Sequence, residues 1–190
     1  MKIFLTVILV GLLAIFAFSY NSLVVNEEIV SESWADVESN MQRKVDLLPN
    51  LVKVVKSYAE HESKLFTSIT ELRASSKSVL GGSEMPSKEQ MQEFSKLNKS
   101  INSSTLKLFA VAENYPNLKS SEQFLTLQAQ IEGTENRINV TRMNFNGAVK
   151  DFNANIRTFP SNIVASIMSF SKLEYFKAEP VAKQKLELDL

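Results

Sequence analysis

Hydrophobic residues recur every seven positions from Leu23 onward, and no strand-like alternation interrupts them. The first series is Leu23, Val30, Val37, Lys44, Leu51, Tyr58, Leu65, Leu72 and Val79. A second series, displaced by four residues, is Trp34, Met41, Leu48, Val55, Glu62 and Ile69. Spacings of three and four keep such residues on one helix face, and a sustained repeat of seven indicates coiled-coil-like packing. The pattern predicts one long helix from Leu23 to Val79. Within the two series only Lys44 and Glu62 are charged.

Pro49 lies inside this predicted helix. Proline removes one helical hydrogen bond and usually kinks or ends a helix. Both series nevertheless keep their register through Pro49, whereas a loop would normally reset the phase. We therefore expect a continuous, kinked helix. The alternative is a new helix that begins near Pro49 and is capped by Asp46.

Three further helices follow. Gly81-Gly82 stops the first helix, and Pro86 suits the first turn of the second helix, which ends at Tyr115-Pro116. Ser120 with Gln123 resembles a capping box that opens the third helix. The third helix carries the cleanest stripe, which is Phe124, Ile131, Ile138, Phe145, Phe152 and Phe159. The pattern predicts a short fourth helix over residues 160–170, after which we expect the tail to dock through Tyr175 and Phe176. The predicted fold is all-α: an elongated antiparallel bundle of three long helices plus a short fourth.

The N-terminal segment differs from the rest of the chain. Residues 3–18 form sixteen positions without a charge, about 24 Å of helix against a hydrocarbon core of about 30 Å. We predict a transmembrane anchor at residues 1–25, the bundle at 26–172 and a tail at 173–190. The alternative is a signal peptide cleaved after Ser19, which would release a secreted bundle. Lys2 precedes the segment, and no Lys or Arg follows it until Arg43, with acidic residues in between. This charge bias predicts a single-pass protein of the bacterial inner membrane with its bundle on the exported side.

Composition excludes several chemistries. The chain has no cysteine and one histidine, His61, so thiolate sites and paired-histidine metal sites are excluded. Lys+Arg and Asp+Glu both number 21, which gives no indication of nucleic-acid binding. No phosphate-binding loop or nucleophile elbow occurs. We expect no cofactor, no metal and no enzymatic activity.

Two polar segments remain as candidates for interaction or for fixing the helix register. They contain Arg43, Asp46 and Asn50 in the first helix, and Glu135, Asn136 and Arg137 in the third. The third helix is also rich in asparagine, a poor helix former. An interhelical polar layer and a partner-binding surface both account for this pattern. An alternative function is an enzyme or metal-dependent factor that uses Asp46, His61, Glu132 and Glu135.

Several motifs, in order, resemble the LemA family. They lie at residues 20–24 (YNSLV), 34–38 (WADVE), 42–52 (QRKVDLLPNLV), 58–62 (YAEHE), 115–118 (YPNL), 132–138 (EGTENRI), 159–162 (FPSN) and 175–176 (YF). Phe145 and Phe152 stand where the family often has tyrosine, so no role for those hydroxyls carries over. The resemblance implies a bacterial membrane-anchored helical bundle without an established reaction. We therefore expect a non-enzymatic envelope scaffold, held in the lipid bilayer and binding an unknown protein partner or itself.

Overall fold

The computed structural model describes residues 1–59, 61–81 and 85–177 and is helical. Its elements are α1 (Lys2–Lys56), α2 (Ser63–Val79), α3 (Lys88–Glu113), α4 (Pro116–Lys119), α5 (Glu122–Asn155) and α6 (Ser161–Ile167). No strand occurs in the described ranges. The predicted all-α class is confirmed.

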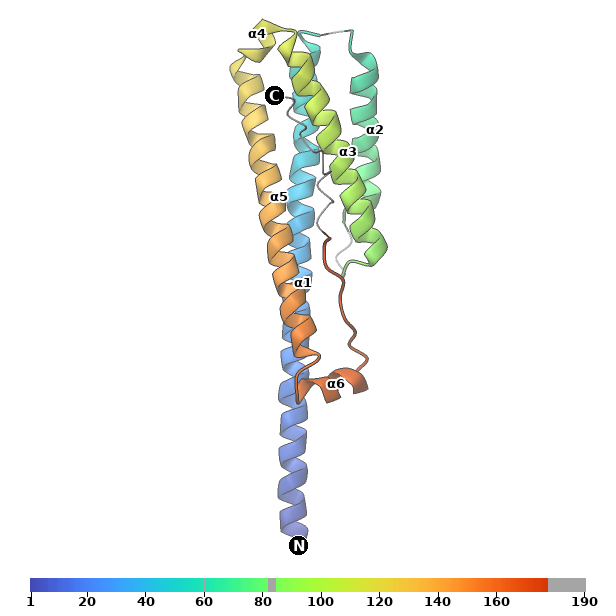
Figure 1. Ribbon diagram of the computed structural model, residues 1–190, viewed down its shortest axis with the longest axis vertical. Coiled ribbons are helices and arrows are strands. Elements are labelled where there is room, and N and C mark those ends of the chain that lie inside the picture. Colours follow the sequence, from blue (N-terminus) through green and yellow to red (C-terminus); the bar gives the residue numbers. More distant parts are fainter. Residues whose placement is uncertain (60, 82–84, 178–190) are drawn as a thin grey trace, which may run out of the picture.

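The four longest helices run side by side and alternate in direction (Figure 1). α5 packs along much of α1, while α2 packs chiefly on α3 and more lightly on α1. α6 lies at the base of the bundle, across α1, and an extended segment then returns between the long helices. The result is an elongated bundle built around α1.

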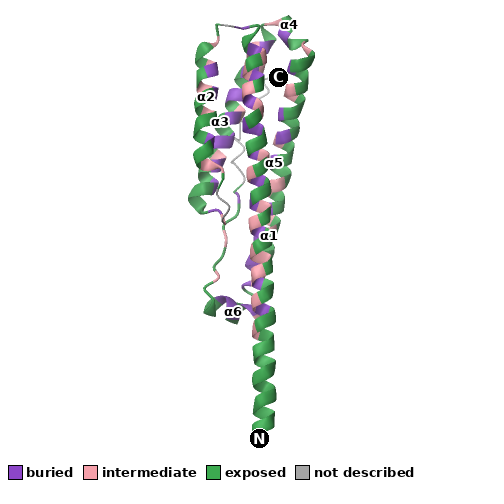
Figure 2. Cartoon of the chain, turned by 180° about the vertical axis from the view of Figure 1, so that it is seen from behind, coloured by how far each residue is buried: buried purple, intermediate pink, exposed green. Residues whose placement is uncertain are grey.

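The heptad pattern explains which face of α1 is covered. Both series are buried throughout the part of α1 that enters the bundle, and Figure 2 shows this face as a buried stripe. On α5 the stripe from Phe124 to Phe152 is likewise buried. Phe159, its last predicted member, is instead 80% exposed, because α5 ends at Asn155.

The first long helix is shorter than the pattern predicts. α1 continues through Pro49, as expected, but ends at Lys56, and α2 begins at Ser63 with the opposite direction. A single helix over residues 23–79 is therefore wrong. The intervening residues contain neither glycine nor proline, so they give no local signal that a helix ends there. After the turn the series describe the buried face only in part: Ile69 of the second series is buried, whereas Leu65 of the first is half-buried and Phe66, outside both series, is buried.

Helix capping differs at one position from the prediction. α3 begins after Ser87, whose Oγ accepts from the N–H of Gln90 (3.1 Å), while the Ser87 N–H donates to Oε1 of Gln90 (2.8 Å). This is a complete capping box. At α5 the predicted capping box of Ser120 and Gln123 is wrong. The N-cap is Ser121, whose side chain makes no capping hydrogen bond, and the Ser120 hydroxyl donates to the carbonyl of Pro116 (3.0 Å).

Residues 3–18 of α1 extend beyond the bundle and are almost entirely uncovered (Figure 2). α1 is long and apolar enough to cross a membrane. The same helix continues without interruption into the bundle, so the apolar segment and the bundle share one rigid element.

Candidate functional site

Lys44 occupies a core position of the heptad series and is completely buried. Its ammonium donates to Oδ1 of Asn98 (3.1 Å), and also to Oδ1 of Asn102 and Oε2 of Glu135. Asn102 in turn donates from Nδ2 to Oε1 of Glu135 (3.3 Å). We call these four residues the Lys44 cluster. It joins α1, α3 and α5 at one level of the bundle.

In the Lys44 cluster, burial of the ammonium and the nearby carboxylate of Glu135 have opposite effects on the pKa of Lys44. Burial lowers the pKa of Lys44 below its usual value, and the hydrogen bond and charge of Glu135 act in the opposite direction. Three acceptors meet the three ammonium hydrogens, so the buried donor is satisfied. The Glu135 side chain keeps 31% of its surface exposed, on the edge of a hollow of about 450 Å³. The cluster connects three helices at one level, and in other bundles buried polar groups placed in this way specify the helix register.

Two asparagines of α5 hold the extended C-terminal segment. Asn153 donates to the carbonyl of Leu173 and accepts its N–H, both at 2.9 Å. Asn146, two turns earlier, donates to the carbonyl of Phe176 (3.1 Å) and accepts its N–H (2.9 Å). Seven helical residues and three extended residues span about 10 Å each, so the repeats match. These side chains account for two of the six asparagines of α5.

Phe176 anchors the same segment among three helices. Its ring packs on Trp34 of α1 (5.6 Å between centroids), Phe94 of α3 (5.7 Å) and Phe145 of α5 (5.4 Å). The guanidinium of Arg142 lies 4.8 Å from the ring centroid on top of this cluster. Tyr175 is 44% exposed, so of the two aromatics only Phe176 docks as predicted.

A second polar region lies along the outer seam between α1 and α5. Arg43 and Arg137 line one hollow of about 430 Å³ together with Gly133 and Thr134. Asn50 lines a neighbouring hollow of about 620 Å³, and Thr126 borders both. We call the first of these the arginine hollow. It brings together a residue from each of the two polar segments identified in the sequence.

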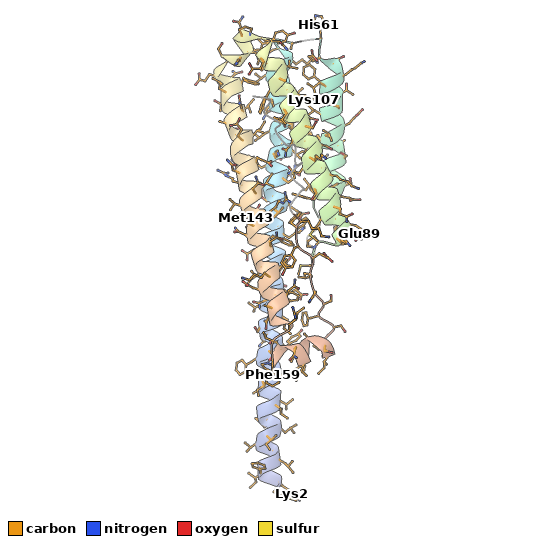
Figure 3. All side chains as sticks on the ribbon, viewed as in Figure 1. Lys2, His61, Glu89, Lys107, Met143 and Phe159 are labelled. Atoms are coloured by element: carbon orange, nitrogen blue, oxygen red, sulfur yellow. The ribbon has the colours of Figure 1, made fainter. Side chains whose placement is uncertain are left out.

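The remaining candidate residues lie apart from these two regions. Asp46 accepts a hydrogen bond from Gln42 on its own helix (3.0 Å), and Asn136 is exposed. Glu132 accepts from Gln128 (3.0 Å), and His61 is exposed at the far end of the bundle (Figure 3). In the described ranges no three His, Asp or Glu side chains approach as a metal site. The alternative of an enzyme or metal-dependent factor is not supported.

An antiparallel bundle with a polar cluster inside it and a bare apolar helix below it defines a class: membrane-associated helical-bundle proteins. The chain belongs to the LemA family, whose family model matches residues 33–189.

Three relatives are similar over most of their length. Magnetosome protein MamQ 2 of Paramagnetospirillum magneticum is 25% identical, over 90% of this chain and 69% of its own. Magnetosome protein MamQ of Magnetospirillum gryphiswaldense is 24% identical, over 90% and 70%. Protein LemA of Metamycoplasma hominis is 23% identical, over 96% and 81%.

Proposed function

We propose that the chain is a single-pass, non-enzymatic scaffold of the bacterial inner membrane that holds a protein partner beside the bilayer. The observation that carries this proposal is the continuity of α1. One helix contains both the bare apolar segment and the central element of the bundle, so a partner bound to the bundle is held at a fixed height above the membrane. The names of the related chains, magnetosome protein MamQ and protein LemA, are not names of enzymes.

The arginine hollow is the partner surface that we favour. Arg43 and Arg137 are exposed, come from different helices and line the same depression. Guanidinium groups bind carboxylates through paired hydrogen bonds. The partner therefore presents an acidic segment to the seam between α1 and α5, with Asn50 available for further polar contacts.

Photo-crosslinking in cells tests this surface. A photoreactive residue at Gln130, which is exposed and lines the arginine hollow, should capture one defined partner through an acidic segment of that partner. The same photoreactive residue placed at Lys107, which is exposed on α3, is the matched control and should not capture this partner. Charge reversal with Arg43→Glu and Arg137→Glu should abolish capture, whereas Arg43→Lys should weaken it. Capture that survives charge reversal, or recovery of lipid and self-contacts alone, would contradict the proposal.

The side of the membrane needs its own measurement. Because the chain has no cysteine, Lys107→Cys introduces a single thiol on the bundle. A membrane-impermeant maleimide should label it in intact cells if the bundle is on the exported side, as the absence of Lys and Arg between the anchor and Arg43 favours. Labelling only after lysis would place the bundle in the cytoplasm. A mature N-terminus at Tyr20, found by mass spectrometry, would instead establish the secreted alternative.

A further inference from the structure

The short helix α6 has one covered face and one bare face. Ser161, Val164 and Ala165 are buried against the bundle. The opposite face carries Ile163 and Ile167, which are 52% and 63% exposed. No residue of α6 carries a charge, and Phe159, just before it, is 80% exposed (Figure 3). Large apolar side chains rarely gather on a surface without a partner.

α6 lies at the level where the bundle ends and the bare part of α1 begins (Figure 1). Phe170, which follows α6, packs on Tyr20 of α1 with the ring centroids 6.3 Å apart. Asn155, which ends α5, donates to the hydroxyl of Ser22 (2.9 Å). These contacts tie this end of the bundle to Tyr20–Ser22, immediately after the apolar segment.

The length of the apolar segment places the membrane boundary at the same level. A hydrocarbon core of about 30 Å needs about 20 helical residues, so a span that begins at Ile3 ends near Ser22. Residues 3–18 alone fall short by about 6 Å. Tyr20 is then an interfacial residue of the type that forms aromatic belts.

We propose that α6 and Phe159 form a membrane-surface foot whose bare face lies in the boundary between headgroups and acyl chains of the bilayer. The inference rests on the proposed membrane anchor. Lipid fits this face because the face is apolar, charge-free and at the level where the bare surface of α1 begins. Arg157 and Lys172, which flank α6 in the sequence and are exposed, suit phosphate headgroups. The foot makes α1 and α6 two points of contact with the membrane, which fixes the tilt of the bundle as well as its height.

Single-cysteine labelling of the full chain tests the foot, since the native sequence contributes no thiol. Ile163→Cys and Ile167→Cys carry an environment-sensitive fluorophore in vesicles of phosphatidylethanolamine and phosphatidylglycerol. Leu106→Cys is the matched control, because Leu106 is an equally exposed aliphatic residue (66%) near the far end of α3. Leu9→Cys reports on the anchor. Trp34 fluorescence verifies that each variant keeps the folded core.

We expect probes at 163 and 167 to shift to shorter wavelength and to be quenched by lipids spin-labelled near the headgroup. The probe at 9 should be quenched by lipids labelled deep in the acyl chain, and the probe at 106 by neither. Quenching at 9 without quenching at 163 and 167 would overturn the foot and leave the anchor intact. Absence of quenching at all positions would overturn the anchor itself. Energy transfer between labelled copies at 163, without lipid quenching, would show that a second copy covers the face and would also overturn the foot.

Discussion

Two stretches of α1 invert the usual relation between hydropathy and burial. Near its N-terminus, Leu9 is 57% exposed, whereas Lys44 is completely buried 35 residues later on the same helix. Transfer free energies alone would place these side chains the other way round. The difference is in what each stretch has as a neighbour. Lys44 meets three acceptors from α3 and α5, while the leucines of residues 3–18 have no protein beside them.

This comparison shows two different environments along α1. A core position accepts a charged side chain when the opposing helices supply hydrogen-bond acceptors at the same level. An apolar stretch that is hydrophobic on all sides remains bare when its solvent is lipid. Burial within the protein is therefore a property of the partners as much as of the residue.

The largest expected effect comes from the same substitution made in the two stretches. Leu48→Ala removes a fully buried side chain and should lower the free energy of unfolding by about 2–5 kcal/mol. Leu9→Ala should leave unfolding of the bundle unchanged, because Leu9 contacts no other element. Urea unfolding in detergent micelles, followed by the fluorescence of Trp34, measures both. A comparable loss for Leu9→Ala would show that residues 3–18 pack against protein and would remove the contrast.

The second prediction concerns the charge partner of Lys44. Glu135→Ala leaves the buried ammonium without its carboxylate and should cost about 2–4 kcal/mol, below the upper range for such pairs because Glu135 is partly exposed. Glu132→Ala, one turn earlier and exposed, should change stability by less than about 0.5 kcal/mol. Lys44→Met should be milder than Glu135→Ala, since methionine fills the site and Glu135 stays hydrated. A greater loss for Lys44→Met would show that the charge itself contributes net stability.

Sequence reasoning predicts the parts of the fold that depend on local periodicity. The register of both series through Pro49 correctly indicates a continuous helix there, and the stripe of α5 identifies its buried face. The turn after Lys56 escapes prediction because its residues have no breaker, and the decision between helix and turn is made by the packing of α2 on α3. Lys44 appears in the sequence as an interruption of the repeat. Its role depends on Asn98 and Asn102, which are more than 50 residues away, and no local pattern identifies them.

The candidate site is predictable to a smaller extent. Glu135 belongs to a segment that is polar in the sequence. Its partner, Lys44, occupies a heptad position on another helix, and the segment itself does not indicate it. Arg43 and Arg137 are both candidates from composition, and only the antiparallel pairing of α1 with α5 brings them to one hollow. Asn146 and Asn153 share a heptad position, and this spacing can be recognised in the sequence. Their partner is a backbone without a motif, so the spacing does not reveal what they bind.

The third prediction extends the contrast between covered and bare surface to the C-terminal segment. Asn153→Ala removes both hydrogen bonds to the backbone of Leu173 and should cost about 1–2 kcal/mol. Hydrogen exchange at the amide of Leu173 should accelerate strongly, because its N–H loses its acceptor. Asn144→Ala, at an exposed position of the same helix, should leave that exchange unchanged. Unchanged exchange at Leu173 in Asn153→Ala would show that Asn146 and Phe176 hold the segment without Asn153.

The smallest expected effect is the pH dependence of stability that the Lys44 cluster contributes. The pKa of Lys44 lies below its usual value of 10.5 in the folded chain, so between these two values the unfolded chain binds more protons. The free energy of unfolding should therefore rise with pH in this alkaline window, and the gain should be complete above 10.5. The effect is small because burial and Glu135 act on the pKa in opposite directions. Lys44→Met should lack the rise, and subtracting its profile removes the titration of all other groups. Glu135→Gln removes the group that holds the pKa up, so the rise should begin at lower pH. Identical profiles for the native chain and Lys44→Met would show that desolvation and the carboxylate cancel, and that the buried lysine is as fully protonated as an exposed one.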